Sequence, residues 1–134
     1  MNRKKSRKVA MELCYSMEIS KETPEEIYES FIDNYEGDIS QLDKVYILEL
    51  LNLIKTHKDE IDEKIQPHLR GWKLERISKV NLSILRIATA EMLYIEEIPD
   101  KVSINEALEL TKEYSDEKSV SFINGVLDSI NKGL

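Results

Sequence analysis

Cysteine, proline and glycine are scarce in this chain, and each scarcity excludes a class of structure. Cys14 is the only cysteine among 134 residues, so neither an internal disulfide nor a thiolate metal cluster can form. A lone cysteine also suits a reducing cytosol, and we therefore predict a cytoplasmic protein. Three prolines and four glycines are too few for a flexible or Pro-rich linker. We predict one domain over residues 1–134.

Long apolar runs and alternating apolar patterns are also missing. No stretch approaches the roughly 18 apolar residues that span a bilayer. The basic N-terminus is not followed by the apolar region and cleavage site of a secretory signal. No segment alternates for long enough to make a strand. These absences predict an all-α domain that does not enter a membrane.

Motifs that carry catalysis are absent too. The sequence has no GxxxxGK, HExxH or GxSxG motif. His57 and His68 are separated by Pro67, and neither has a second metal ligand at helical spacing. Cys14 lies on an apolar helical stripe, which predicts a core residue rather than a nucleophile. We predict no enzymatic activity, no metal and no cofactor.

What the sequence does contain is helical periodicity with start and stop signals. We predict about seven helices, with boundaries near residues 3–18, 24–36, 41–56, 57–66, 79–96, 103–114 and from Ser115 or Asp116 onward. Thr23 with Glu26, and Ser103 with Glu106, have the spacing of capping boxes. The run 41–56 is apolar on most sides, which predicts the central buried helix.

The stretch FINGVLD, residues 122–128, permits two interpretations. Asn124-Gly125 between apolar residues is typical of a two-residue hairpin turn. Helical spacing instead places Val120, Ile123, Val126, Leu127 and Ile130 on one face. A glycine inside a helix costs only about 1 kcal/mol relative to alanine, so we predict a helix.

Two helical flanks combine an aromatic ring with cations. Phe122 falls beside Lys118, away from the apolar face of the last helix. On the first helix, a second such flank lies opposite the stripe of Val9, Ala10, Leu13, Cys14 and Met17, and it consists of Lys4, Lys8, Met11 and Tyr15. Lysines hold phosphates and aromatic faces stack single-stranded bases. The alternative is that each aromatic packs under a neighbouring helix.

The net charge of −7 conceals an asymmetry. Five basic side chains and no acid lie within residues 1–8, whereas the other 126 residues carry 14 basic and 26 acidic side chains. An acidic body with one basic end suits a localised phosphate-binding patch rather than a general affinity for polyanions. The alternative is a solvated, partly disordered terminus.

Three segments together resemble the NusB family of bacterial transcription antitermination factors. The most specific is KVSINEALELTKEYSDEKSVSFINGVLD, residues 101–128, which is similar to the family's INEA helix, acidic-Lys-Ser turn and FVNGVLD segment. KVNLSILRIATAEML, residues 79–93, resembles its ILRIA helix. RKKSRKVAMELCYSMEI, residues 3–19, resembles its basic first helix.

The resemblance implies an all-α fold of about seven helices in two helical subdomains. It implies binding of the boxA element of ribosomal RNA leaders, as a heterodimer with the ribosomal protein NusE, within an antitermination complex on RNA polymerase. By matched position it implies RNA contacts from Arg3, Lys4, Lys5, Arg7, Lys8, Lys118, Ser119 and Phe122. It places Tyr15, and Asn81 on the ILRIA helix, at the surface facing NusE.

The sequence departs from the family pattern at several positions. Lysine predominates in the first helix, where arginine is usual, which removes some bidentate and stacking ability. Lys118 replaces an acid found in some members, and Cys14 replaces an aliphatic residue. Alternatives are the related RNA-binding module of ribosomal RNA cytosine methyltransferases, a protein-binding adaptor, and a helix-turn-helix DNA regulator. The first is disfavoured because the chain ends at Leu134 without a catalytic domain. The last is disfavoured because only the first helix is strongly basic.

Overall fold

The fold consists of helices alone. The computed structural model describes residues 1–134 and contains no strand. Its α-helices are α1 Arg3–Ser20, α2 Pro24–Asp33, α3 Lys44–Thr56, α4 Lys58–Ile65, α5 Lys79–Tyr94, α6 Asp100–Tyr114 and α7 Glu117–Lys132. Three short 3-10 helices are η1 Ile39–Gln41, η2 Gln66–His68 and η3 Leu74–Arg76. The prediction of an all-α fold with about seven helices is confirmed.

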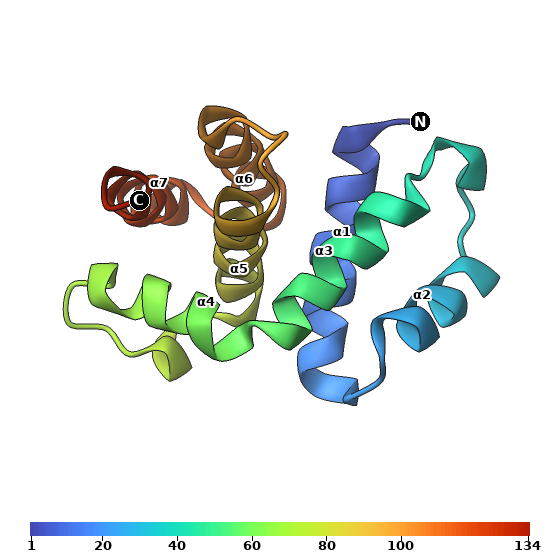
Figure 1. Cartoon of the computed structure of the whole chain (residues 1–134), viewed down its shortest axis with the longest axis horizontal. Coiled ribbons are helices and arrows are strands. Elements are labelled where there is room, and N and C mark those ends of the chain that lie inside the picture. The colour runs from blue at the N-terminus through green and yellow to red at the C-terminus, as the bar shows by residue number, and fades with distance from the viewer.

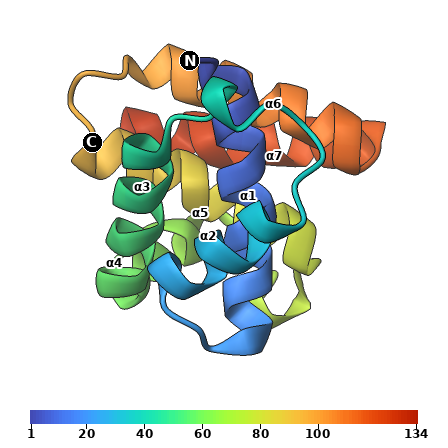
Figure 2. The same cartoon turned by 90° about the vertical axis from the view of Figure 1, so that its right-hand side faces the viewer.

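The helices form two groups around a shared core. Helices α1, α2 and α3 lie on one side of the molecule and α4 to α7 on the other (Figure 1). Helix α7 runs across the molecule at a steep angle to α1 (Figure 2). One cluster of 30 buried apolar residues includes members of all seven α-helices, so the two groups are held by one core. No helix combines the length and hydrophobicity needed to span a bilayer.

Helix α5 holds the central position that the sequence suggested for residues 41–56. Every residue from Asn81 to Glu91 is buried, and α5 contacts α1, α3, α4, α6 and α7. Helix α3 is buried on one side only, and Val45 on its other side is largely exposed. The prediction that residues 41–56 form the central helix was therefore wrong. Arg86 and Glu91 make the sequence of α5 look polar, although both side chains are buried and paired with residues far away in the sequence.

One of the two predicted capping boxes forms. Thr23 and Glu26 make both reciprocal hydrogen bonds at the start of α2. The predicted capping box of Ser103 and Glu106 does not form, because α6 already begins at Asp100 after Pro99. The Ser103 hydroxyl, one turn inside the helix, donates to Glu91 Oε1 at 2.7 Å instead. Both residues therefore join α6 to its neighbours.

The segment FINGVLD lies in the middle of α7, as predicted. Ile123 and Leu127 are fully buried, whereas Phe122 is half-buried at the edge of the core. On α1, the expectation that Met11 lies off the core face was wrong, since it is fully buried. Helices packed against α1 cover Met11, and the wheel of a single helix cannot reveal that.

Cys14 is a core residue, as predicted, and this makes its reactivity testable. Its side chain is buried, and burial raises the pKa of the thiol to about 11. Thiol reagents attack the thiolate, which is scarce at neutral pH when the pKa is this high. We expect the native protein to resist a chromogenic disulfide reagent and to react fully in urea. Rapid labelling of the native protein would contradict this burial.

Candidate nucleic-acid interface

The basic N-terminal segment is an ordered part of α1. Asn2 caps the helix, since its Oδ1 accepts from the Lys5 backbone N–H at 3.0 Å. The Asn2 N–H donates to the carbonyl of Gln41 at 2.7 Å, which ties the start of α1 to η1. The alternative of a disordered basic tail is therefore wrong. The cations of residues 3–8 are held at fixed helical spacing on α1.

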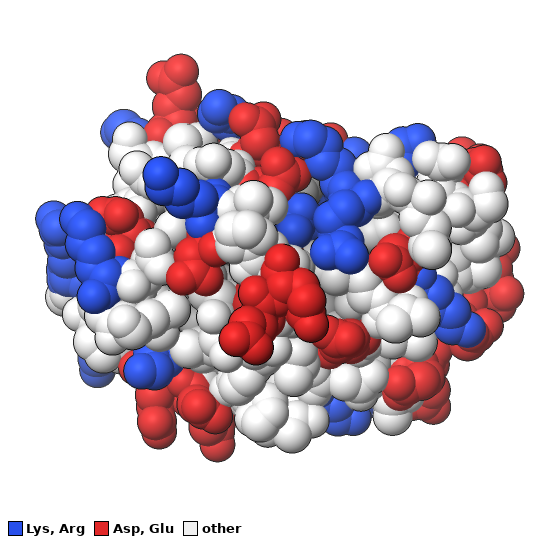
Figure 3. All heavy atoms as spheres, turned by 45° about the horizontal axis from the view of Figure 1, so that its top comes forward, with Lys and Arg blue, Asp and Glu red and all other residues white.

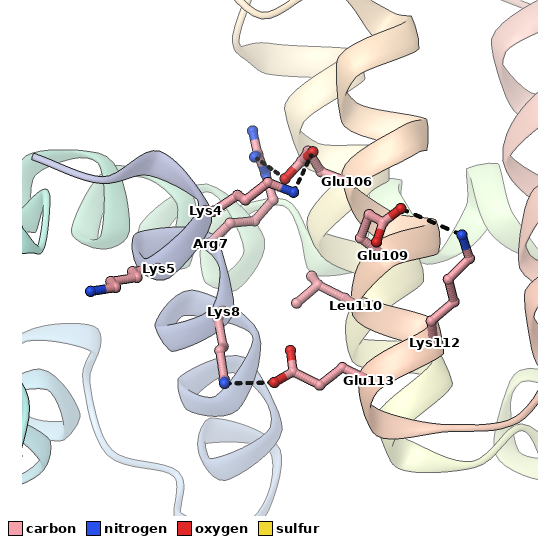
Figure 4. Close-up of a pocket in the computed structure, with 9 residues that line it drawn as sticks. All are labelled: Lys4, Lys5, Arg7, Lys8, Glu106, Glu109, Leu110, Lys112 and Glu113. Atoms are coloured by element: carbon pink, nitrogen blue, oxygen red, sulfur yellow. Dashed lines mark hydrogen bonds and ion pairs between the residues drawn. The ribbon is translucent and has the colours of Figure 1, made fainter.

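A groove of about 410 Å³ runs between α1 and α6. It is lined by four basic residues of α1 and five residues of α6, and Lys4, Arg7 and Lys8 point across it toward α6 (Figure 4). The lining residues are Lys4, Lys5, Arg7, Lys8, Glu106, Glu109, Leu110, Lys112 and Glu113. Five of these side chains are cationic and three are acidic. The groove thus has a net positive charge on a molecule whose total charge is −7.

Two lysines bridge the groove through exposed ion pairs. Lys4 Nζ lies 3.4 Å from Glu106 Oε2, and Lys8 Nζ lies 2.7 Å from Glu113 Oε1. The hydrogen bond to Glu113 raises the pKa of Lys8. Basic and acidic side chains accordingly lie next to one another on this face (Figure 3). Exposed pairs of this kind contribute at most about 1 kcal/mol, so a phosphate can replace the carboxylate.

The other predicted α1 cations have different surroundings. Lys5 is exposed and points away from α6 (Figure 4). The Arg3 guanidinium lies 4.1 Å from the centre of the Tyr46 ring and 3.5 Å from Asp43. Arg7 is buried, and its Nε donates to Glu91 Oε2 at 2.9 Å. Arg3, Lys4, Lys5 and Lys8 are thus the accessible cations.

Glu91 is a buried carboxylate that links four helices. It accepts hydrogen bonds from Arg7 of α1, the Tyr46 hydroxyl of α3 and Ser103 of α6, while belonging to α5 itself. Burial, followed by the charge of Glu91, raises the pKa of Tyr46. Burial lowers the pKa of Arg7, but the hydrogen bond and charge of Glu91 outweigh it. This cluster fixes the position of the basic helix relative to α6.

A second surface lies beside the N-terminal half of α7. Two hollows of about 280 and 250 Å³ share Trp72 and Phe122 as lining residues. The predicted residues Lys118, Ser119 and Phe122 all line the larger hollow. The structure therefore brings these three together, in a site separate from the groove of α1 and α6.

The sequence analysis missed Trp72 and Arg76 in this hollow. Trp72 is 57% exposed and is the only tryptophan. Its place in the polar segment RGWKLER, between Arg70 and Arg76, was an available signal, because a core tryptophan is normally flanked by apolar residues at helical spacing.

Tyr15 and Asn81, the two positions predicted to face a protein partner, differ in accessibility. Tyr15 is 36% exposed on α1. Asn81 is buried, and its Nδ2 donates to Ser119 Oγ at 3.0 Å. Asn81 also lines the hollow that contains Trp72 and Phe122. It therefore lies with the predicted RNA-contacting residues and not beside Tyr15.

The fold and these surfaces define an all-α protein whose candidate sites are an open charged groove and an aromatic hollow. The NusB family model matches residues 4–132. The chain belongs to the NusB family. It is 59% identical over 132 residues to the transcription antitermination protein NusB of Clostridium botulinum strain Alaska E43, covering 98% of this chain and 99% of that protein.

Solved structures agree with this assignment. The structure of T. maritima NusB has a TM-score of 0.86 and 34% identity, covering 98% of this chain and 92% of that one. A crystal structure of the antitermination factors NusB and NusE in complex with dsRNA matches with a TM-score of 0.84 and 26% identity, covering 98% and 97%. The C. botulinum relative and the NusB solved with NusE are both named for antitermination. As a member of this family, the chain is not an enzyme.

Proposed function

We propose that this protein is a transcription antitermination factor that binds the boxA element of ribosomal RNA leader transcripts. It acts as a heterodimer with NusE and helps RNA polymerase to read through terminators. The observation that carries this proposal is the row of accessible cations on α1 beside the groove with α6. Membership of the NusB family, and a structural neighbour solved with NusE and RNA, support the choice of ligand and partner.

The chemistry of the α1 surface suits a short stretch of phosphate backbone. Arg3, Lys4, Lys5 and Lys8 lie within the first two turns of a capped helix, so the backbone that carries them is already ordered when RNA binds. Arg7 acts indirectly, because its ion pair with Glu91 holds α1 in place. About three to five phosphate contacts predict a log-log salt slope of about −2 to −3.5.

So few phosphate contacts predict that this protein binds RNA with only modest affinity when NusE is absent. A partner that adds RNA contacts explains the need for a heterodimer. We propose that Tyr15 contributes to the NusE-facing surface, since its ring is accessible on α1. Tyrosine suits such a surface because it combines a large apolar area with a polar tip.

The test is a titration of labelled boxA RNA with the protein, with and without NusE, at two salt concentrations. We expect tighter binding of boxA than of a scrambled sequence, and a larger preference when NusE is present. Equal binding of both RNAs in the presence of NusE would refute the proposal. Binding of NusE without any RNA binding would instead indicate a protein-binding adaptor.

The α1 lysines provide a residue-level prediction. Replacing Lys4 and Lys8 together by glutamine removes two phosphate-binding cations without creating new charge repulsion with Glu106 and Glu113. We expect the affinity for RNA to fall about tenfold and the salt slope to become shallower by about 1.4, from about 0.7 per contact. Fluorescence anisotropy at several salt concentrations measures both quantities.

Two further variants make this prediction specific. Glu113→Gln removes the carboxylate that competes for Lys8 and should tighten RNA binding. Lys132→Gln removes an exposed lysine at the far end of α7, paired only with Asp128, and should change little. An equal loss of affinity in Lys132→Gln would mean that only total charge matters.

A further inference from the structure

We infer that the hollow between Trp72 and Phe122 is a nucleobase-binding site, in which Trp72 stacks on an unpaired RNA base and Asn81 contacts its edge. This inference rests on the proposed RNA-binding function and adds three residues to it, namely Trp72, Asn81 and Arg76. The site lies apart from the phosphate-binding surface of α1, since the two hollows share no lining residue with the α1–α6 groove.

The exposure of Trp72 is the first observation. At 57% exposed it is the most accessible aromatic side chain of the molecule, while most other aromatic rings lie in or against the core. Phe122 lines the same two hollows from α7, with one side packed against the core. Two rings around an open hollow offer faces on which bases stack.

The segment that carries Trp72 is held in place. The carboxamide of Gln66 donates from Nε2 to the Trp72 carbonyl at 2.8 Å and accepts at Oε1 from the Leu74 N–H at 3.0 Å. The turn before it uses left-handed backbone at Arg70 and Gly71, with φ of 49° and 91°. The ring is thus presented from an ordered loop, which lowers the entropy lost when a base stacks on it.

Asn81 supplies the second, independent observation. Its side chain lines the hollow, and the residue is only 9% exposed. Its Nδ2 is fixed by Ser119 at 3.0 Å, whereas its Oδ1 is buried and has no hydrogen-bond partner. A buried acceptor without a partner is costly. An amino or imino N–H of a base would satisfy it, and Asn carboxamides recognise base edges by such hydrogen bonds.

The charges around the hollow favour RNA over an apolar protein segment. Arg76 and Lys118 line it and suit the phosphates that flank a stacked base. The one acid, Asp116, caps α7 by accepting from the Ser119 N–H at 2.8 Å. Protein interfaces also concentrate aromatic and arginine side chains, so the assignment to a base depends on the buried Asn81 acceptor without a partner, beside the two cations.

The test uses the fact that Trp72 is the only tryptophan. Intrinsic fluorescence of the unmodified protein therefore reports on this ring alone. We expect quenching when boxA RNA or a short oligouridylate is added, saturating at the same RNA concentration as anisotropy. Trp72→Ala should weaken RNA binding about 5- to 100-fold, while Trp72→Phe retains most of the affinity. Ile19→Ala, an exposed apolar residue of α1 outside both surfaces, should bind normally.

Asn81→Ala should reduce the difference in affinity among oligouridylate, oligocytidylate and oligoadenylate. Unchanged discrimination would overturn the assignment of Asn81. RNA binding with the expected salt dependence, but without quenching and without an effect of Trp72→Ala, would overturn the base site and leave the proposed function intact. No RNA binding by the wild type would overturn both. Loss of NusE binding alone in Trp72→Ala would make the hollow a protein-docking surface.

Discussion

Glu91→Gln is expected to lower the free energy of unfolding by about 3 to 5 kcal/mol. The substitution preserves shape but removes the negative charge that faces the buried Arg7, whose side chain is only 4% exposed. It also replaces one acceptor oxygen by a donor in a site where Arg7, Tyr46 and Ser103 all donate. An uncompensated buried cation and mismatched donors together account for the size of the effect.

Urea denaturation measures this loss, and two further variants define its cause. Asp128→Asn removes a carboxylate of an exposed pair on α7 and should change stability by less than about 0.5 kcal/mol. Arg7→Met combined with Glu91→Met removes both charges and should be more stable than Glu91→Gln alone, because well-packed apolar side chains can replace a buried pair. A Glu91→Gln variant within 1 kcal/mol of wild type would contradict the proposed coupling.

The same cluster connects stability with the proposed RNA-binding surface. Glu91 joins α5 to α1, α3 and α6, and Arg7 also lies 3.6 Å from Glu106 at the groove. When this network is weakened, the distance between the α1 lysines and α6 is no longer fixed. We infer that Arg7 serves RNA binding by positioning α1, while its neighbours Lys4 and Lys8 contact the phosphates.

Local patterns in the sequence were sufficient to predict the helices. The start of α1, the capping box of Thr23 and Glu26, and the helix through Asn124-Gly125 depend on residues a few positions apart. Periodicity within one segment contains this information. The failures concern residues whose partners are remote in sequence, such as Ser103 and Glu91.

For the candidate surfaces too, residues close in sequence were predictable and residues joined only by the tertiary fold were not. Helical spacing placed Phe122 beside Lys118, the family resemblance added Ser119, and the structure keeps the three together. Trp72 joins them only through the tertiary fold, because it comes from a loop far away in the sequence. Burial of Arg7 was unpredictable for the same reason, since its carboxylate partner lies on α5.

Adjacent residues of α7 allow stability to be separated from RNA binding. Ile123 is fully buried, whereas its neighbour Phe122 lies half-buried at the hollow. We expect Ile123→Ala to lower the free energy of unfolding by about 2 to 5 kcal/mol, because it leaves a cavity in the core. RNA affinity of the folded Ile123→Ala protein, measured at low temperature, should stay near that of wild type.

Phe122→Ala is expected to have the opposite profile. Only part of its ring packs against the core, so the loss of stability should be smaller than for Ile123→Ala, at about 1 kcal/mol. Affinity for single-stranded RNA should fall about tenfold, since a stacking face is lost. If Phe122→Ala instead loses several kcal/mol of stability and binds RNA normally when folded, the ring is a core residue. Trp72 would then be the one aromatic ring of the larger hollow on which a base could stack.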